Sequence, residues 1–84
     1  MKLKLFTIYD KKTKVHTPPI HGHNRGQIYR QLEMDLKKGS STIVHYPDDY
    51  QLYEVGVFDD QSGLVEGHSL DFVCEMSDII TQSE

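Results

Sequence analysis

The stretch HYPDDYQLYEVGVFDDQSG, residues 45–63, decides the fold. Pro47 and its two acidic neighbours are typical of a turn or a helix start, and the run after them is rich in aromatic and β-branched residues that suit a half-buried strand. Residues 59–63 have turn chemistry, and Gly63 at their end suits a left-handed backbone conformation. A shorter run, Leu64-Val65-Glu66, follows. The stretch therefore predicts a β-hairpin.

Residues 2–10 predict a second long strand, because apolar and polar side chains alternate there. The alternation places two groups on opposite faces: Leu3, Leu5, Thr7 and Tyr9 on one, and Lys4, Phe6 and Ile8 on the other. Since both faces carry apolar groups, we expect a central strand with a helix over one face. Residues 14–17 predict a short edge strand that ends at Pro18 and Pro19, which cannot donate to a ladder. Residues 20–24 read as a loop, with Asn24 capping the next helix.

A helix is predicted over residues 25–38. Ile28, Leu32 and Leu36 recur every four residues, with Tyr29 beside them, and form a stripe that would face the sheet. Arg30 and Lys37 fall on the opposite, solvent-facing side. Gly39 is a helix stop signal, and residues 39–42 are expected to form a loop.

The C-terminal segment fits two patterns. Leu70, Phe72 and Cys74 alternate as in a strand, whereas Leu70, Val73, Ser77 and Ile80 have helical spacing. We favour a strand over 70–75, followed by a frayed polar tail over 81–84. The prediction for the whole chain is a single α+β domain over residues 1–84, in which one α-helix packs on one face of a small antiparallel β-sheet.

Composition is that of a small globular protein, with 37% apolar and 26% charged residues among 84. No apolar run is long enough for a membrane span or a secretory signal, so we expect a soluble protein in the cytoplasm. The single cysteine, Cys74, cannot form an internal disulfide and is expected to be a small buried hydrophobe. A core this small would gain from self-association, so a homodimer is a reasonable expectation.

Charge is segregated along the chain. Residues 1–38 contain all nine basic residues and three acids, giving +6, whereas residues 39–84 contain ten acids and no Lys or Arg, giving −10. Two interpretations follow. The basic half could attract a polyanion while the acidic half attracts a basic partner. Alternatively, the two halves could pack together and neutralise each other through surface ion pairs.

Two constellations could carry metal or acid–base chemistry. His16, His21 and His23 could share a zinc ion only with further ligands such as Asp10 or His45. The acid pairs 48–49 and 59–60 could hold Mg²⁺ or act as acid and base, but turn hydrogen bonds and the helix dipole explain them better. No phosphate loop or nucleophile elbow is present. The sequence thus predicts no enzyme, no cofactor and no metal.

Basic residues mixed with aromatic residues in the first half favour single-stranded nucleic acid, since cations neutralise phosphates and aromatic rings stack on bases. The alternative is that the aromatic residues are core and the lysines a solvated rim. The candidate DNA-binding residues are Lys2, Lys4, Lys11, Lys12, Lys14, Arg25, Arg30 and Lys37.

Residues 6–12, FTIYDKK, together with the stretch 45–63 resemble the small nonstructural protein of gokushoviruses, which are single-stranded DNA phages of the Microviridae. The family pattern runs His-Pro-Glu-Asp-Tyr, then Leu-aromatic-Glu, then Gly-x-Phe-Asp-Asp-x-x-Gly. This sequence departs from it by Tyr46, inserted between His45 and Pro47, and by Asp48 in place of Glu. The segment after Gly67 matches poorly.

The resemblance implies a nonenzymatic phage protein that acts in the bacterial cytoplasm during genome replication, at the switch from duplex replication to single-strand synthesis and packaging. The function we expect is therefore binding of single-stranded DNA. The rival is a protein interaction module, either a homodimer or an acidic surface that docks on a basic capsid or replication protein of phage or host.

Overall fold

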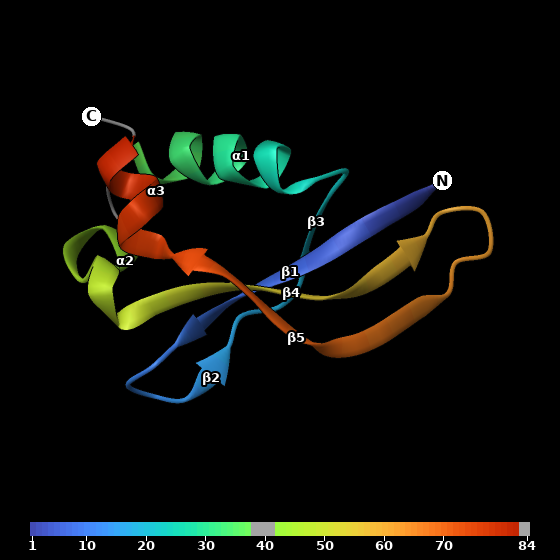
Figure 1. Cartoon of the computed structure of the whole chain (residues 1–84), viewed down its shortest axis with the longest axis horizontal. Helices are drawn as coiled ribbons and strands as arrows, with labels where there is room; N and C mark the ends of the chain where they lie inside the picture. Colours follow the sequence, from blue (N-terminus) through green and yellow to red (C-terminus); the bar gives the residue numbers. More distant parts are fainter. Residues whose placement is uncertain (38–41, 83–84) are drawn as a thin grey trace.

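The computed structural model describes residues 1–37 and 42–82, with side chains described as far as Ile79. The chain forms one antiparallel sheet of five strands with helices over it (Figure 1). This confirms the predicted α+β class. The strands are β1 (Lys2–Asp10), β2 (Val15–His16), β3 (Ile20–Gly22), β4 (Tyr50–Asp59) and β5 (Val65–Glu75). The helices are α1 (Arg25–Lys37), α2 (Thr42–His45), the 3-10 helix η1 (Pro47–Asp49) and α3 (Met76–Gln82).

β1 is central, as its two-faced apolar pattern predicts. It pairs with β4 along its full length, from Lys2 opposite Asp59 to Asp10 opposite Tyr50. Its other edge is shared by β2 and then β3, which are separated by the two prolines at 18 and 19. Residues 20–24 were expected to be a loop, and that prediction is wrong for Ile20–Gly22. Three residues are too short for a periodic signal, and they become a strand only because the edge of β1 is available.

The hairpin predicted from residues 45–63 is present between β4 and β5. Gly63 has φ +76°, and its N–H donates to the Asp59 carbonyl at 2.8 Å. β5 is much longer than the predicted 64–66 strand, because that run and the predicted strand over 70–75 join into one. The ladder is irregular where they join: one residue of β4 lies between Glu54 and Gly56, against three of β5 between Asp71 and Gly67. The extra residues form a bulge in β5.

α1 starts as the sequence predicts. Asn24 Oδ1 accepts a hydrogen bond from the Gln27 N–H at 2.9 Å, which caps the first turn. Ile28 and Leu32 are buried, and Leu36 and Tyr29 pack beside them. The predicted last residue Lys38, the stop signal at Gly39 and the loop residues up to Ser41 lie outside the described residues.

Two helices were not predicted. α2 takes up Thr42, assigned to a loop from sequence, and continues to His45. α3 follows β5 directly and runs to Gln82, so helix extends into the tail expected from residue 81. Its Met76 and Ile79 are buried and complete the core. The helical spacing seen in the C-terminal segment therefore belongs to its second half, and the alternating spacing to its first.

The core lies between the sheet and the helices α1 and α3. Its buried members come from β1, α1, β4 and α3: Phe6, Ile8, Ile28, Leu32, Leu52, Met76 and Ile79. Cys74 packs partly against them, and burial raises the pKa of its thiol. The side chain therefore stays a protonated thiol at neutral pH, but it is half-buried and not the fully buried hydrophobe predicted from sequence.

Candidate nucleic-acid interface

The sheet face turned away from the helices carries a cluster of aromatic side chains. In Figure 1, α1 and α3 lie on one side of the sheet, and no helix of the described residues covers the other. Phe6 and Ile8 of β1 point to the helix side, whereas Thr7 and Tyr9 point to the open side, as alternation predicts. This uncovered side is called the open face below.

Four rings from four strands form a continuous row on the open face. Tyr9 of β1 contacts His16 of β2, with ring centroids 4.7 Å apart, and both contact Tyr53 of β4, at 6.0 and 5.7 Å. Tyr53 in turn contacts Phe72 of β5 at 5.8 Å. We call Tyr9, His16, Tyr53 and Phe72 the aromatic row. The interplanar angles are tilted or edge-to-face, which is a favourable arrangement for aromatic pairs.

Hydrogen bonds hold two of these rings, His16 and Tyr53, in place. The Thr7 hydroxyl lies 2.7 Å from His16 Nδ1. The Tyr53 hydroxyl donates to Gln51 Oε1 at 3.1 Å, and Gln51 Nε2 donates to Glu75 Oε1 at 2.9 Å. Rings fixed in this way lose little conformational entropy when a ligand binds.

The aromatic row matches the chemistry of single-stranded nucleic-acid binding. Bases stack on aromatic side chains presented by an open sheet, each contributing about 1–3 kcal/mol with little regard to sequence. Phe72 is 51% exposed and the other three are partly exposed, so ring surface is available to a ligand. The aromatic residues considered from sequence were Phe6, Tyr9 and Tyr29, with Phe6 and Tyr29 as core in the alternative, and both do pack in or against the core. The structure assigns Phe6 to the core and adds three rings, from β2, β4 and β5, to Tyr9.

Half of the predicted DNA-binding cations form ion pairs with acids of the second half. Lys4 Nζ and Arg25 Nε lie 3.7 and 3.4 Å from Glu54 Oε1. Lys11 Nζ lies 3.4 Å from Glu75, and Lys12 Nζ lies 3.4 Å from Asp49. The two halves of the chain thus neutralise each other at these positions, which was the second of the two interpretations of the charge pattern.

The remaining predicted cations make no ion pair within the part of the chain that the structure describes: Lys2, Lys14, Arg30 and Lys37. They are exposed but lie apart, at the start of β1, in the β1–β2 turn and on α1. The structure therefore does not bring the eight residues together on one surface. The β1–β2 turn, with its three lysines, adjoins the Tyr9–His16 end of the aromatic row.

The histidine and acid constellations considered from sequence have other surroundings. His16 belongs to the aromatic row, and His21 lies in β3 opposite Leu5. Asp49 pairs with Lys12, and Asp60 Oδ1 accepts a hydrogen bond from the N-terminal amino group at 2.8 Å. Among the described residues, one group has the spacing to hold a metal ion, and it consists of Glu54, His68 and Asp71. Sequence analysis missed it, because its β5 members face Glu54 only through the bulge.

Asp59 is explained by the hairpin turn. Its Oδ1 accepts hydrogen bonds from the N–H groups of Gln61 at 2.9 Å and Ser62 at 3.4 Å. The first of these lowers the pKa of the Asp59 carboxyl below its ordinary value of 3.8. The carboxylate is thus part of the turn.

The family comparison covers nearly the whole chain. Residues 3–79 match the model of the family described as phage ORF5 protein. The chain belongs to this phage ORF5 family. The match extends through β5 into α3, beyond Gly67, where the resemblance read from sequence ended. No curated protein and no solved structure matches the chain.

None of the helices in the described residues is long and apolar enough to cross a membrane.

Proposed function

We propose that this phage protein is nonenzymatic and binds single-stranded DNA on the open face, with the aromatic row as the stacking surface. The observation that carries the proposal is the row itself, in which each of four rings contacts at least one other on the uncovered face of the sheet. The resemblance to the gokushovirus nonstructural protein favours action during genome replication or packaging in the bacterial cytoplasm.

The geometry favours single strands over duplex. In a duplex the bases are stacked on one another, so exposed rings gain contacts only from unpaired bases. Duplex binding depends mainly on phosphate neutralisation. Here four candidate cations are neutralised by acids, and the formal net charge is −4.

Binding of a fluorescent oligothymidine, followed by anisotropy at low salt, tests the proposal. The variant Tyr53→Leu with Phe72→Leu keeps apolar volume on the open face but removes two adjacent rings. We expect its affinity to fall by about tenfold or more, because stacking contributes about 1–3 kcal/mol per base.

Tyr46→Leu is the matched control. Tyr46 is 61% exposed, and its ring lies 6.0 Å from Lys12 Nζ, outside the aromatic row. This variant should bind DNA as the unmodified protein does. Equal losses in both variants, or no binding at low salt, would reject the stacking model.

A second candidate function is that of an interaction module, and the edge of the sheet favours it. β5 pairs with β4 alone among the described strands, so its outer edge leaves backbone donors and acceptors unpaired. Its exposed apolar residues include Val65, Leu70 and Phe72. A second copy, or a capsid or replication protein, could add a strand there. Analytical ultracentrifugation decides whether the protein self-associates: a monomer at about 100 μM would exclude the homodimer as a stable state.

A further inference from the structure

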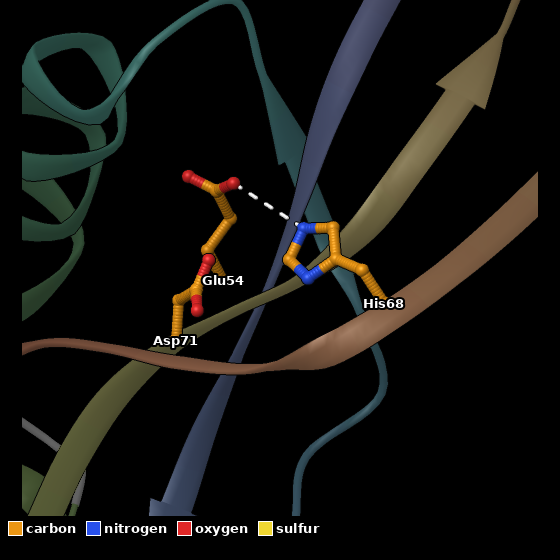
Figure 2. Close-up of side chains that lie close together, drawn as sticks. All are labelled: Glu54, His68 and Asp71. Carbon is orange, nitrogen blue, oxygen red and sulfur yellow. Dashed lines mark ion pairs between the residues drawn. The ribbon is translucent and has the colours of Figure 1, made fainter.

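Glu54, His68 and Asp71 form a compact group where β5 crosses β4 (Figure 2). One potential ligand atom of each residue lies within 4.8 Å of those of the other two. Glu54 comes from β4 and is 9% exposed, whereas His68 and Asp71 come from β5 and are accessible to solvent. An imidazole and two carboxylates form a mixed nitrogen and oxygen donor set of the kind that divalent transition metals use.

The bulge in β5 creates this group. Residues 68 and 71 are an odd number apart, so in a regular strand their side chains would point to opposite faces. The two extra residues of β5 between Gly67 and Asp71 change that direction. Both side chains then face the carboxylate of Glu54 (Figure 2). Bulges commonly re-aim side chains in this way at functional sites.

A hydrogen bond orients the imidazole of His68. Its Nδ1 lies 2.6 Å from the carbonyl oxygen of Ser69, which can only accept, so Nδ1 carries the proton. In the neutral ring Nε2 then presents a lone pair, and it does so toward Glu54 Oε2 at 3.3 Å. In the protonated ring Nε2 instead donates to Oε2 as an ion pair, so a metal ion would take the place of this proton. The Nδ1–carbonyl contact is also the usual second contact of a histidine metal ligand.

The separation of the two atoms fits a shared ion. Ligands at about 2.1 Å from zinc, at a tetrahedral angle, lie about 3.4 Å apart. The observed distance between His68 Nε2 and Glu54 Oε2 is 3.3 Å. Little movement would be needed to admit the ion.

Neighbouring charges leave room for a cation. Lys4 and Arg25 contact the other oxygen of Glu54, Oε1, and not the one that faces His68. The carboxylate of Asp71 makes no ion pair or hydrogen bond with another described residue. An ion between Asp71 and Glu54 would relieve the repulsion between two close carboxylates.

We propose that Glu54, His68 and Asp71 bind a divalent transition-metal ion, with Zn²⁺ as the best match, through Oε2, Nε2 and a carboxylate oxygen respectively. The ion would join β4 to β5 at the bulge, where the ladder lacks regular hydrogen bonds. A fourth position would be left for water. The site lies on the helix side of the sheet, so the proposal is independent of DNA binding on the open face.

Calorimetric titration of chelator-treated protein with ZnCl₂ tests the site. His68→Ala and Asp71→Asn should each lower zinc affinity by about tenfold or more, since each removes a direct ligand. Both positions are accessible to solvent, so these variants should fold, and circular dichroism checks that they do.

The control variants remove a carboxylate and an imidazole that lie outside the proposed site. Glu66→Gln removes an exposed carboxylate of β5 outside the group, and His21→Ala removes an exposed histidine of β3. Both should bind zinc as the unmodified protein does.

Two results would overturn the site. The first is no zinc binding up to about 1 mM, the affinity expected of adventitious contacts, and the second is unchanged binding in both ligand variants.

Discussion

At the residue scale, two glycines of the β4–β5 hairpin have different roles. A Cβ at Gly56 would clash with the carbonyl oxygen of Glu66 on β5, because the strands approach closely there. A Cβ at Gly67, directly opposite, would come no nearer than 3.9 Å to the Val55 carbonyl oxygen. The close approach of β4 to β5 at this point thus depends on the absence of a side chain at Gly56.

Gly56→Ala should therefore destabilise the protein by about 1–3 kcal/mol, the usual cost of overpacking. Urea denaturation followed by circular dichroism measures the change. Gly67→Ala is the matched control and should cost less than Gly56→Ala, since its Cβ has space. The reverse order would show that the strands are farther apart than described.

Asp59 gives the turn a pH dependence. Its carboxyl has a folded-state pKa lowered by the N–H of Gln61, so the stability it contributes is present above the ordinary pKa of 3.8 and is lost as the pH falls through the lower folded value. Asp59→Asn should accordingly lose less stability than the unmodified protein between about pH 6 and pH 3. Thermal melting at both pH values measures this difference, and equal losses would contradict it.

Sequence patterns were informative at single residues where the cause is local. Asn24 as a helix cap and Gly63 in a left-handed turn depend on the backbone within a few positions, and both predictions are confirmed. The group of Glu54, His68 and Asp71 depends on a bulge set by pairing of distant residues, which no local pattern reveals.

At the element scale, length separates what could be predicted from what could not. β1, β4 and α1 span nine to thirteen residues, and their periodic patterns predicted them. β3, α2 and α3 have three to seven residues, too few for a clear period, and they form where the rest of the fold offers partners. The aromatic row combines both cases: Tyr9 and Tyr53 lie in predicted strands, but only sheet order brings them together.

Helix α3 is expected to stabilise the fold by packing on the core, and substitution of its Met76 tests this expectation. Met76 is 0% exposed, whereas Met34 on α1 is 62% exposed. Met76→Ala should lower the free energy of unfolding by about 2–5 kcal/mol through lost burial and a cavity. Met34→Ala should change it by about 0.5 kcal/mol or less. Equal effects in urea denaturation would mean that α3 does not pack on the core.

At the scale of the whole molecule, the sequence has a strong charge asymmetry that folding reduces. β1 and β4 bring the basic and acidic halves into one sheet, and pairs such as Lys11–Glu75 form across it. The charge tally was correct, but sequence could not place the halves relative to each other. A basic half in sequence is therefore a weaker predictor of a basic surface than it first suggests.

This pairing predicts a shallow salt dependence for DNA binding. Four predicted cations remain without ion pairs in the described chain, and each phosphate neutralised contributes about 0.7 to the log–log slope for single strands. The slope should thus be no steeper than about −3.

Glu75→Gln provides the comparison, because it frees Lys11 while keeping an acceptor for Gln51. It should raise affinity and steepen the slope by about 0.7. An unchanged slope would place Lys11 outside the DNA contact.

The two edges of the sheet differ, and the difference limits how copies of the protein could associate by adding strands. On the β1 side, the edge consists of the short strands β2 and β3 with two prolines between them. This edge offers no continuous row of backbone groups for another strand to pair with. Along β5 the edge is eleven residues long, with a bulge, and no other strand of the described residues pairs with it. Another strand could therefore be added along β5 but not along the β2 and β3 edge. Two copies joined at β5 would leave no second long edge among the described strands for a third copy, so strand addition there would stop at a dimer and would not propagate into fibres.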